Sequence, residues 1–520
     1  MQDPTLAAEA LALLPADVGA SPLFSADLAP VPPKRRTWNT YAFAALWISM
    51  CHCIPTYTLA GSMIAAGMSW WQALGTIGIG TLVVLVPILL NAHPGTKYGL
   101  PFPVLARASF GTTGANIPAM LRAVVACGWF GINTYFGGEG VSAVIATLWP
   151  GWETFAGGVA VVGYPLPHFI AFMIFWALNV FIIFRGMDAV RIFENWAAPL
   201  VLVMAAVLLV WVVARAGGVG PMMSEPSHFA SAGDFFVVFF PWMTGVVGFW
   251  STLALNIPDF TRFGKGQREQ QLGQTLGLPT TMIVFSAMAV VITSAAKAVL
   301  QGVPVKDLWD PVTILSFITS PTPPGSLTAP LLNDSATRAI VAILSVFGVA
   351  VASISVNIAA NVVSPANDIA NLAPTKITFK RGGLITAIAG AVMLPWKLAG
   401  AGIIGWLIGY SALLGPIAGI MIVDYWALRK TELDVAELYR PNGKHAGTNG
   451  VAVVAMVLGV LPNIPGFLAD VKLVDAVPAL FHWIYVFAWF VGFFVAGGVF
   501  YAGMRGKILA PAPQAAKPAA

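Results

Sequence analysis

Long apolar runs alternate with short polar segments along the whole chain. We predict that twelve of these runs cross the bilayer as helices, and most of them are long enough, at 1.5 Å per residue, for its roughly 30 Å hydrocarbon core. Backbone groups inside lipid must bond to one another, and the alternation typical of a membrane barrel is absent, so we expect helices. The predicted spans are 40–65, 69–91, 115–147, 168–184, 192–214, 235–258, 275–297, 337–363, 382–396, 401–427, 449–466 and 480–503.

The composition supports an all-α polytopic membrane protein. Hydrophobic residues make up 58% of the chain and charged residues only 9%, against roughly a quarter in soluble domains. A large soluble enzyme would expose far more Lys and Glu, so the composition excludes that class. No phosphate-cradling loop or nucleophile with a neighbouring base is evident, so no enzyme is expected.

The basic residues predict the orientation. With the amino terminus inside, 20 of the 27 Lys and Arg fall on one side of the twelve spans, and Arg122 lies within the third span. The positive-inside rule then predicts both termini to be cytoplasmic, in a cell (inner) membrane. The net charge of +5 follows from this bias, so no nucleic-acid partner is needed. The other side receives only Arg215, Lys297, Lys306, Arg338, Lys397 and Lys472.

The two ends of the chain lack apolar runs of spanning length. Residues 1–36 are predicted to be a cytoplasmic tail, and so are the Pro/Ala-rich residues 506–520. The three cysteines, Cys51, Cys53 and Cys127, lie in apolar segments and imply no disulfide framework. No cofactor, no obligate protein partner and no metal other than a coupling Na⁺ is expected.

Two spans contain residues that disfavour a continuous helix. The first carries Ser49, His52 and Pro55 near its middle, and the sixth carries Gly245 and Gly248. We therefore expect both spans to be interrupted, as in carriers whose substrate and ion sites lie at broken helices near the midplane. Ordinary helix kinks are the alternative.

Several side chains within the spans suit a flat heterocyclic ligand. Trp129 and Asn133 are four residues apart and hence on one helical face, where an indole can stack and an amide can hydrogen-bond. Trp250 offers a second aromatic wall, and Asn361 offers a second amide. Packing and hydrogen bonds between helices are the alternative role for these residues.

Ionisable and oxygen-bearing side chains within the spans are candidates for coupling. His52, Glu139 and Arg122 lie in apolar segments, where a charge is costly. Glu139, flanked by glycines, suits a coupling proton or a cap at a helix break. The Ser355 hydroxyl suits a hard cation, or an interhelical hydrogen bond.

The sequence resembles the nucleobase–cation symporter-1 family of secondary transporters. The match runs from about residue 37 to 500, nearly the whole chain. The long motifs occur in the family's order, which makes the resemblance specific. They are NAHPGTKYGLPFPVLARASFG (91–111), GWFGINTYFGGEG (128–140), FWSTLALNIPDFTRFGKGQ (249–267), VNIAANVVSPANDIANL (356–372) and GYSALLGPIAGIMIVDYW (409–426).

The resemblance implies a LeuT-like fold with two inverted repeats of five helices, residues 37–215 and 235–427, and two further helices within 447–505. It also implies import of a nucleobase (uracil or a purine), allantoin or hydantoin, coupled to Na⁺ or H⁺. An uncoupled facilitator or channel for small heterocycles is the alternative function.

The family's substrate contacts are carried over to six positions of this chain. Two of them depart from the family pattern: members often have Gln or Glu at the position of Asn133, and Asn or Gln at that of Cys53. A shorter amide and a weakly bonding thiol both change the contacts available to the ring. The implied substrate residues are Trp129, Asn133, Phe249, Trp250, Asn361 and Cys53.

The coupling-ion site departs from the family as well. Sodium-coupled relatives use carbonyls matching Ser49, His52 and Ala352, and two adjacent hydroxyls of which this chain keeps Ser355. Val356 stands where the second hydroxyl would be and offers no oxygen to a hard cation. Coupling to H⁺ through Glu139 or His52 is therefore as well supported as coupling to Na⁺.

Overall fold

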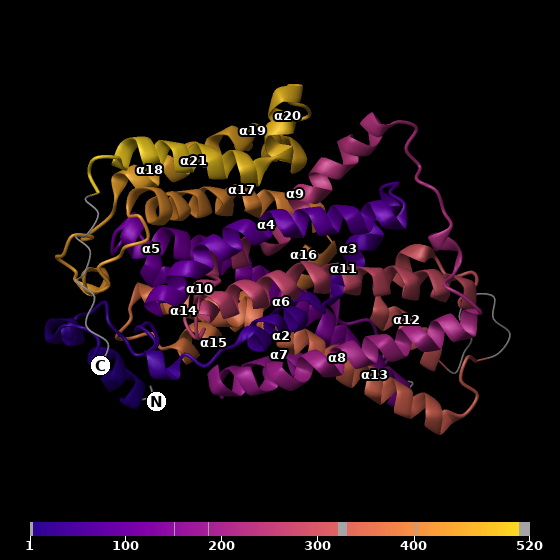
Figure 1. Ribbon diagram of the computed structural model, residues 1–520. Coiled ribbons are helices and arrows are strands. Elements are labelled where there is room, and N and C mark those ends of the chain that lie inside the picture. Colours follow the sequence, from indigo (N-terminus) through magenta and orange to yellow (C-terminus); the bar gives the residue numbers. More distant parts are fainter. Residues whose placement is uncertain (1–3, 150, 186, 321–329, 401–402, 509–520) are drawn as a thin grey trace.

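The computed structural model describes residues 4–149, 151–185, 187–320, 330–400 and 403–508. Long helices lie side by side in one bundle, with the first and last parts of the chain at the same end of it (Figure 1). Most of the bundle is made of long α-helices. They are α4 (Trp70–Tyr98), α6 (Asn116–Leu148), α7 (Leu166–Ile183), α8 (Met187–Ala216), α9 (Ala232–Asn256), α11 (Gln267–Val299), α13 (Ser335–Val356) and α17 (Ile403–Ile422).

Several spans are built from consecutive pieces. The helix α13 continues through the π-helical turn η5 (Asn357–Val362) into α14 (Val363–Leu372), and α17 continues into a second π-helical turn, η6 (Val423–Leu428). The other composite spans are α2 (Thr40–Cys51) with α3 (Ile54–Ala65), α18 (Gly450–Val460) with η8 (Leu461–Asn463) and α19 (Ile464–Asp470), and α20 (Ala479–Val486) with α21 (Ala488–Met504).

Short elements connect these spans. A two-stranded antiparallel sheet pairs Val161 with Tyr164 between α6 and α7. The connecting helices and strands are α1 (Pro4–Leu11), η1 (Ala16–Ala20), η2 (Pro33–Arg35), α5 (Phe102–Phe110), β1 (Ala160–Val161), β2 (Tyr164–Pro165), η3 (Pro221–Met223), α10 (Pro258–Thr261), η4 (Val305–Trp309), α12 (Pro311–Thr319), α15 (Phe379–Val392), α16 (Pro395–Gly400) and η7 (Ala436–Tyr439).

The predicted membrane spans are largely confirmed. Among the described residues, nine helices are long and apolar enough to cross a membrane, and two sharply bent pairs raise the number to eleven. The remaining predicted span, 382–396, forms the 14-residue helix α15. It ends early because Pro395 disfavours helix at the residue before it, and Leu394 adopts a left-handed φ of 53°.

The break predicted in the first span is confirmed. The helix α2 ends at Cys51 and α3 begins at Ile54, and the two axes are bent by 61°. Cys53 between them is extended, with φ −133° and ψ 158°. Its N–H donates to the Cys51 carbonyl at 3.0 Å, whereas in a continuous helix it would donate to the Ser49 carbonyl.

The break predicted in the middle of the sixth span is wrong, because α9 is one helix from Ala232 to Asn256. Its glycines serve close packing instead. A Cβ at Gly248 would lie 2.6 Å from the Leu407 carbonyl oxygen, and one at Gly245 would lie 2.7 Å from Ile404 Cδ1. The missing side chains let α9 approach α17, and neither position requires a helix break.

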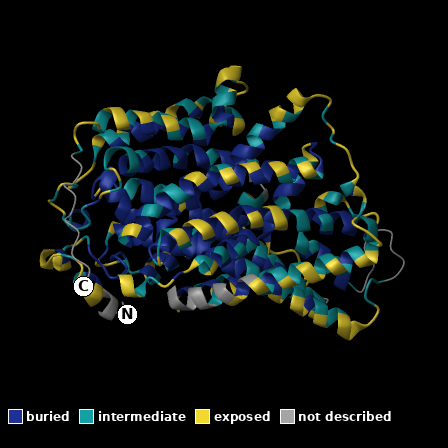
Figure 2. Cartoon of the chain, in the orientation of Figure 1, coloured by how far each residue is buried: buried dark blue, intermediate teal, exposed yellow. Residues whose placement is uncertain are grey.

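The pattern of burial fits a lipid environment. Buried residues run through the middle of the bundle, and exposed residues line the outer faces of α8 and α13 (Figure 2). Many of those exposed residues are large and apolar, such as Val203 and Val207 on α8 and Ile343 and Phe347 on α13. A hydrocarbon solvent covers such a surface without cost, whereas water does not.

The amino-terminal segment packs against one end of the bundle. Leu28 and Val31 are buried, and the Tyr439 hydroxyl donates to the Leu28 carbonyl at 2.6 Å. Arg262 donates to the Asp27 carbonyl at 2.9 Å. Residues 1–36 were expected to be a simple tail, yet the part described is a folded cover over this end. The Pro/Ala-rich stretch 509–520 lies outside the described residues.

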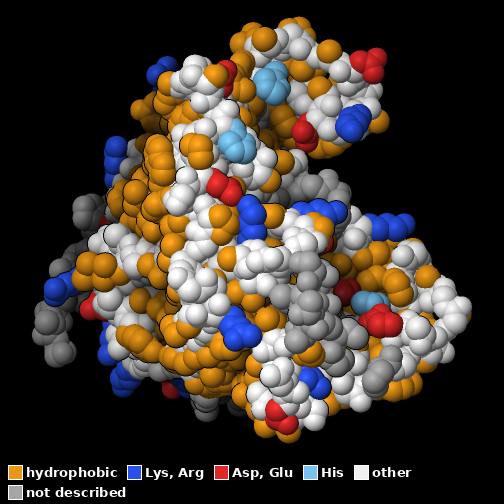
Figure 3. Space-filling view, turned by 90° about the vertical axis from the view of Figure 1, so that its right-hand side faces the viewer, with side chains coloured by type: hydrophobic (Ala, Val, Ile, Leu, Met, Phe, Trp, Pro, Cys, Tyr) orange, Lys and Arg blue, Asp and Glu red, His pale blue; other side chains and the backbone are white. Residues whose placement is uncertain are grey.

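The two ends of the bundle differ. The amino-terminal segment, α5 and α10 lie at one end, and α12 lies at the other (Figure 1). Basic residues converge at the first end, where Arg36 donates to the Thr96 carbonyl and Lys97 pairs with Glu432 at 2.8 Å. The opposite end shows only scattered side chains of both charges among apolar ones (Figure 3).

Candidate functional site

Four aromatic rings from three helices meet beside the broken span. Trp129 of α6 contacts Phe249 of α9 edge to face, with ring centroids 5.3 Å apart. Phe249 contacts Trp250 at 5.1 Å, and Trp250 contacts Trp47 of α2 at 5.1 Å. All four are buried. The structure therefore brings the three predicted aromatic residues together and adds Trp47, which the sequence reasoning missed.

Tyr410 of α17 joins this aromatic cluster by hydrogen bonds. Its hydroxyl accepts a hydrogen bond from the Trp129 indole N–H at 3.3 Å and donates to the Gly248 carbonyl at 2.9 Å. It thereby ties α6, α9 and α17 together at the level of the cluster. Tyr410 lies in a family-like motif of the sequence, but nothing in that motif indicates that its hydroxyl faces Trp129.

Asn133 lies on the same face of α6 as Trp129, as its spacing predicts. Its side-chain N–H donates to the Trp129 carbonyl at 3.1 Å, one turn back along the helix. Its Oδ1 accepts no hydrogen bond from the described part of the chain. The bond to the Trp129 carbonyl fixes which way the amide is turned, so its Oδ1 acceptor and the second N–H of its Nδ2 are left for a ligand.

Asn361 belongs to a buried polar network around the π-helical turn η5. Its Nδ2 donates to Asn357 Oδ1 at 3.1 Å. Asn357 in turn donates to the Thr134 hydroxyl at 3.0 Å and to Asn179 Oδ1 at 3.3 Å. Sequence reasoning found Asn361 but missed the other three. The π-helical turn, a feature common at functional sites, could not be read from the apolar pattern.

The residues of the first-span break are buried. The Ser49 hydroxyl and the His52 Nε2 have no hydrogen-bond partner among the described residues. The His52 Nδ1–H donates to the Ile48 carbonyl at 2.6 Å, and its ring lies 4.3 Å from that of Phe285. Cys53 Sγ lies 3.2 Å from the Thr56 hydroxyl. The break thus holds two polar atoms available to a ligand.

The predicted cation ligands of the eighth span lie on α13, which packs against α2. Ser355 and Val356 are both buried, and Ala352 is partly buried. The fold therefore brings the helix that carries these residues next to the helix that carries Ser49 and His52. Val356 places an apolar side chain at the position where the family resemblance implies a hydroxyl.

Glu139 lies apart from the aromatic cluster, toward the α6–α7 connection. Its carboxylate is 3.0 Å from His168 Nδ1 and accepts a hydrogen bond from the Tyr164 hydroxyl. His168 Nε2 is in turn 2.9 Å from Glu153. The Glu139 side chain is 26% exposed, which differs from the expectation of a buried carboxyl. Its partners hold it at the edge of the bundle.

Arg122 belongs to a fully buried charged network. Its guanidinium lies 3.8 Å from Asp368, and it donates to the Ala360 carbonyl at 3.0 Å. Asp259 is also buried, and its Oδ1 accepts a hydrogen bond from the Asn367 amide at 3.1 Å. Arg262, three residues after Asp259, donates to the Asp27 carbonyl. Asp424 and Arg429 form an ion pair at 2.8 Å.

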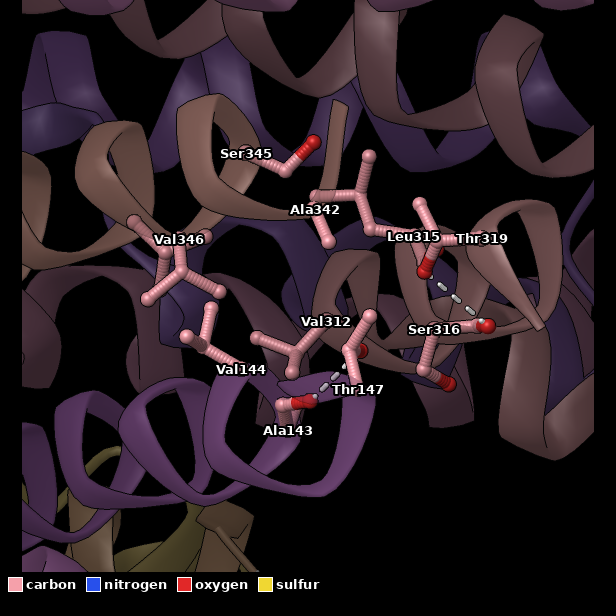
Figure 4. A pocket seen from close by; sticks show the side chains of 11 residues that line it. Ala143, Val144, Thr147, Val312, Leu315, Ser316, Thr319, Ala342, Ser345 and Val346 are labelled. Carbon is pink, nitrogen blue, oxygen red and sulfur yellow. Dashed lines mark hydrogen bonds between the residues drawn. The ribbon is translucent and has the colours of Figure 1, made fainter. Parts of the chain in front are cut away.

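A pocket between α6, α12 and α13 is visible in Figure 4. Small and apolar residues line it, including Ala143, Val312 and Val346, together with the hydroxyl residues Thr147 and Ser345. Its volume of about 20 Å³ is enough for one water molecule and far below that of a heterocyclic ring. None of the four aromatic residues of the cluster lines this pocket, and the pocket is too small for the expected substrates.

Comparison with known proteins identifies the family. The family of permeases for cytosine/purines, uracil, thiamine and allantoin matches residues 30–492. A purine-uracil permease of Arabidopsis thaliana is 40% identical over 91% of this chain and 76% of its own length. An allantoin permease of Bacillus subtilis is also 40% identical, over 91% of each chain.

The fold comparison agrees. The transporter Mhp1, solved in a closed conformation with bromovinylhydantoin bound, superposes with a TM-score of 0.71. The match covers 93% of this chain and 96% of that one at 23% identity. It shows a shared LeuT-like transporter fold. The predicted fold class and the prediction that the chain is no enzyme are confirmed: this chain is a membrane permease and belongs to the nucleobase–cation symporter-1 family.

Proposed function

We propose that this permease imports a nucleobase or a related heterocycle, such as allantoin or hydantoin, coupled to a cation gradient. The observation that carries the proposal is the position of the aromatic cluster. Trp129, Phe249 and Trp250 contact one another beside the α2–α3 break. Asn133 lies one turn from Trp129 on α6, and Asn361 lies on η5, which packs against α6. Stacking faces beside hydrogen-bonding amides suit a flat ring with polar edges.

In this proposal Trp129 is the principal stacking surface, and Trp250 with Phe249 forms the opposite wall. Asn133 and Asn361 bond to the polar edge of the ring, and Cys53 contacts it from the break. The names of the relatives support this range of substrates, since they include purine-uracil and allantoin permeases.

Two coupling ions remain in the proposal, Na⁺ and H⁺. The candidate Na⁺ site consists of three carbonyls and one hydroxyl, those of Ser49, His52 and Ala352 and that of Ser355. It has one oxygen fewer than in sodium-coupled relatives, because Val356 has no hydroxyl. His52 and Glu139 are the candidate proton carriers. His52 is favoured by burial and an unbonded Nε2, and Glu139 by a hydrogen-bonded contact with a second titratable group, His168.

We further propose that both termini are cytoplasmic, in the cell (inner) membrane. The uneven distribution of Lys and Arg supports this orientation, because the basic segments expected inside converge at one end of the bundle. Cysteine-labelling with a membrane-impermeant reagent tests it. Single cysteines are placed at the exposed positions Glu9 and Lys306 in a cysteine-free variant. In intact cells the cysteine at Glu9 should stay unlabelled, and the one at Lys306 should be labelled.

Reconstitution into liposomes tests the function. Labelled uracil, hypoxanthine, allantoin and hydantoin are offered under an imposed Na⁺ gradient, an imposed pH gradient, or neither. A coupled importer accumulates one of these substrates above the external concentration under one gradient, and an ionophore that collapses that gradient abolishes the accumulation. Failure of all four substrates to enter would contradict the proposed substrate class.

The second candidate function, an uncoupled facilitator, predicts a different time course in the same vesicles. Substrate then equilibrates across the membrane and never exceeds the external concentration under either gradient. Glu139→Gln and His52→Gln separate the proton carriers: the residue that carries the proton is the one whose replacement removes stimulation by the pH gradient while exchange of substrate continues.

A further inference from the structure

The hydrogen bonds around η5 have a fixed direction, because they end on backbone carbonyls. Asn179 Nδ2 donates to the Phe175 carbonyl at 2.9 Å, and the Thr134 hydroxyl donates to the Phe130 carbonyl at 2.7 Å. A carbonyl oxygen can only accept. The Asn179 amide must therefore turn its nitrogen toward Phe175 and its oxygen the other way. The single hydroxyl proton of Thr134 is likewise committed, so this hydroxyl can only accept from Asn357.

Asn357 faces two acceptors as a result. Its Nδ2 lies 3.0 Å from the Thr134 hydroxyl and 3.3 Å from Asn179 Oδ1, and turning the amide over would place oxygen against oxygen at both contacts. Its Oδ1 then faces Asn361, whose Nδ2 donates to it at 3.1 Å. The four residues are buried, so water offers no easy alternative partner.

We propose that Asn357, held by Thr134 and Asn179, is a positioning residue that turns the Asn361 amide so that its oxygen faces the substrate. The site then selects heterocycles that present ring N–H donors. This inference rests on the proposed function, since it takes Asn361 as a substrate contact. It deepens that function by naming the chemical group that the contact requires.

Asn133 leads to the same requirement by an independent bond. Its Nδ2 donates to the Trp129 carbonyl, which can only accept, so its Oδ1 is the atom turned outward. Two recognition amides on different helices thus present oxygens. A ring with two N–H groups, such as that of uracil or hydantoin, satisfies both. An N-methylated ring leaves a buried acceptor without a donor.

Binding to the purified full-length protein tests the proposal. The probes are uracil and hydantoin, their 1-methyl and 3-methyl derivatives, and 5-methyluracil and 5-methylhydantoin as controls that add a methyl group and keep both N–H groups. Wild type should bind at least one N-methyl derivative at least tenfold more weakly than its C-methyl control. Equal affinities for N-methyl and C-methyl derivatives would overturn recognition through oxygens.

Variants of the network test the positioning role. Thr134→Val with Asn179→Leu removes both acceptors that hold Asn357, so its amide and that of Asn361 become free to turn over. The N-methyl penalty should then shrink at least threefold, whereas Thr134→Ser, which keeps the hydroxyl, should retain it. An unchanged penalty in the double variant would overturn the positioning role.

Two further outcomes are separable. If the double variant does not fold, Thr134→Val and Asn179→Leu are tested separately, and a penalty equal to that of Thr134→Ser in both single variants counts against the proposal. If wild type binds neither uracil nor hydantoin but binds another heterocycle, the same comparison is made with the N-methyl derivatives of that ring. Binding of no heterocycle at all contradicts the proposed function itself.

Discussion

At the scale of single residues, Trp129 packs edge to face with Phe249, and its indole N–H donates to the Tyr410 hydroxyl. Replacing Trp129 with Ala removes the stacking contact, worth about 1 kcal/mol beyond the area it buries. Uptake of the transported heterocycle should fall at least tenfold, measured as initial rate over a range of substrate concentrations. An unchanged half-saturation constant in Trp129→Ala would exclude the stacking role.

Tyr410 provides the matching control for Trp129. Tyr410→Phe keeps the ring but removes the acceptor of the indole N–H, so substrate affinity should fall by less than in Trp129→Ala. Because Tyr410 acts through Trp129, the double variant should bind no more weakly than Trp129→Ala alone. Additive losses in the double variant would indicate that Tyr410 contacts the substrate directly.

Val356 is the residue at which the cation site departs most clearly from the family. Val356→Thr adds a hydroxyl without a large change in volume, next to Ser355. We expect stimulation of uptake by Na⁺ to rise in this variant, and to remain as in wild type in Val356→Ala, which adds no oxygen. Uptake rates in Na⁺ and in choline media measure both. Equal stimulation in the two variants would place the site elsewhere.

At the scale of elements, the closeness of α9 and α17 depends on glycines. Gly248→Ala forces a methyl group to 2.6 Å from the Leu407 carbonyl, whereas Gly245→Ala meets only the end of the Ile404 side chain at 2.7 Å. The unfolding temperature in detergent should fall clearly for Gly248→Ala and by a smaller amount for Gly245→Ala. Overpacking of this kind costs about 1–3 kcal/mol.

Gly75 of α4 serves as the control for these glycines. It is exposed, and a Cβ added there would meet nothing within 4 Å. Gly75→Ala should therefore leave the unfolding temperature unchanged or raise it slightly, since Ala favours helix over Gly. A similar fall in unfolding temperature for Gly75→Ala and Gly248→Ala would show that helix packing does not explain the glycines of α9.

At the scale of the whole molecule, the buried network of Arg122 ties α6 to α14. Arg122→Met leaves Asp368 buried without its neighbouring cation, a loss of about 3–5 kcal/mol for a broken buried pair. The variant should melt at a lower temperature in detergent and accumulate less in the membrane. Adding Asp368→Asn removes the unpaired charge and should recover most of the loss. No recovery in the double variant would show that Asp368 is not the charge that Arg122 neutralises.

The sequence by itself determined the class of the protein and most of its spans. Apolar length and backbone hydrogen bonding in lipid are local requirements, which each segment meets without reference to the others. The break in the first span, which falls at His52 and Cys53 just before Pro55, follows from local backbone restrictions, because proline has no N–H to donate. The shared face of Trp129 and Asn133 follows from helical periodicity. The family motifs include the aromatic residues Trp129, Phe249 and Trp250, which the fold then brings together.

Only the tertiary structure decided what depends on neighbouring helices. The sixth span is continuous because its glycines admit α17, and a glycine gives the same sequence signal whether it breaks a helix or packs against one. Glu139 is partly exposed because His168 and Tyr164 hold it at the edge of the bundle. The packed amino-terminal segment, Tyr410 beside Trp129 and the amides around Asn357 all rest on contacts between residues far apart in the chain, and no local pattern records such contacts.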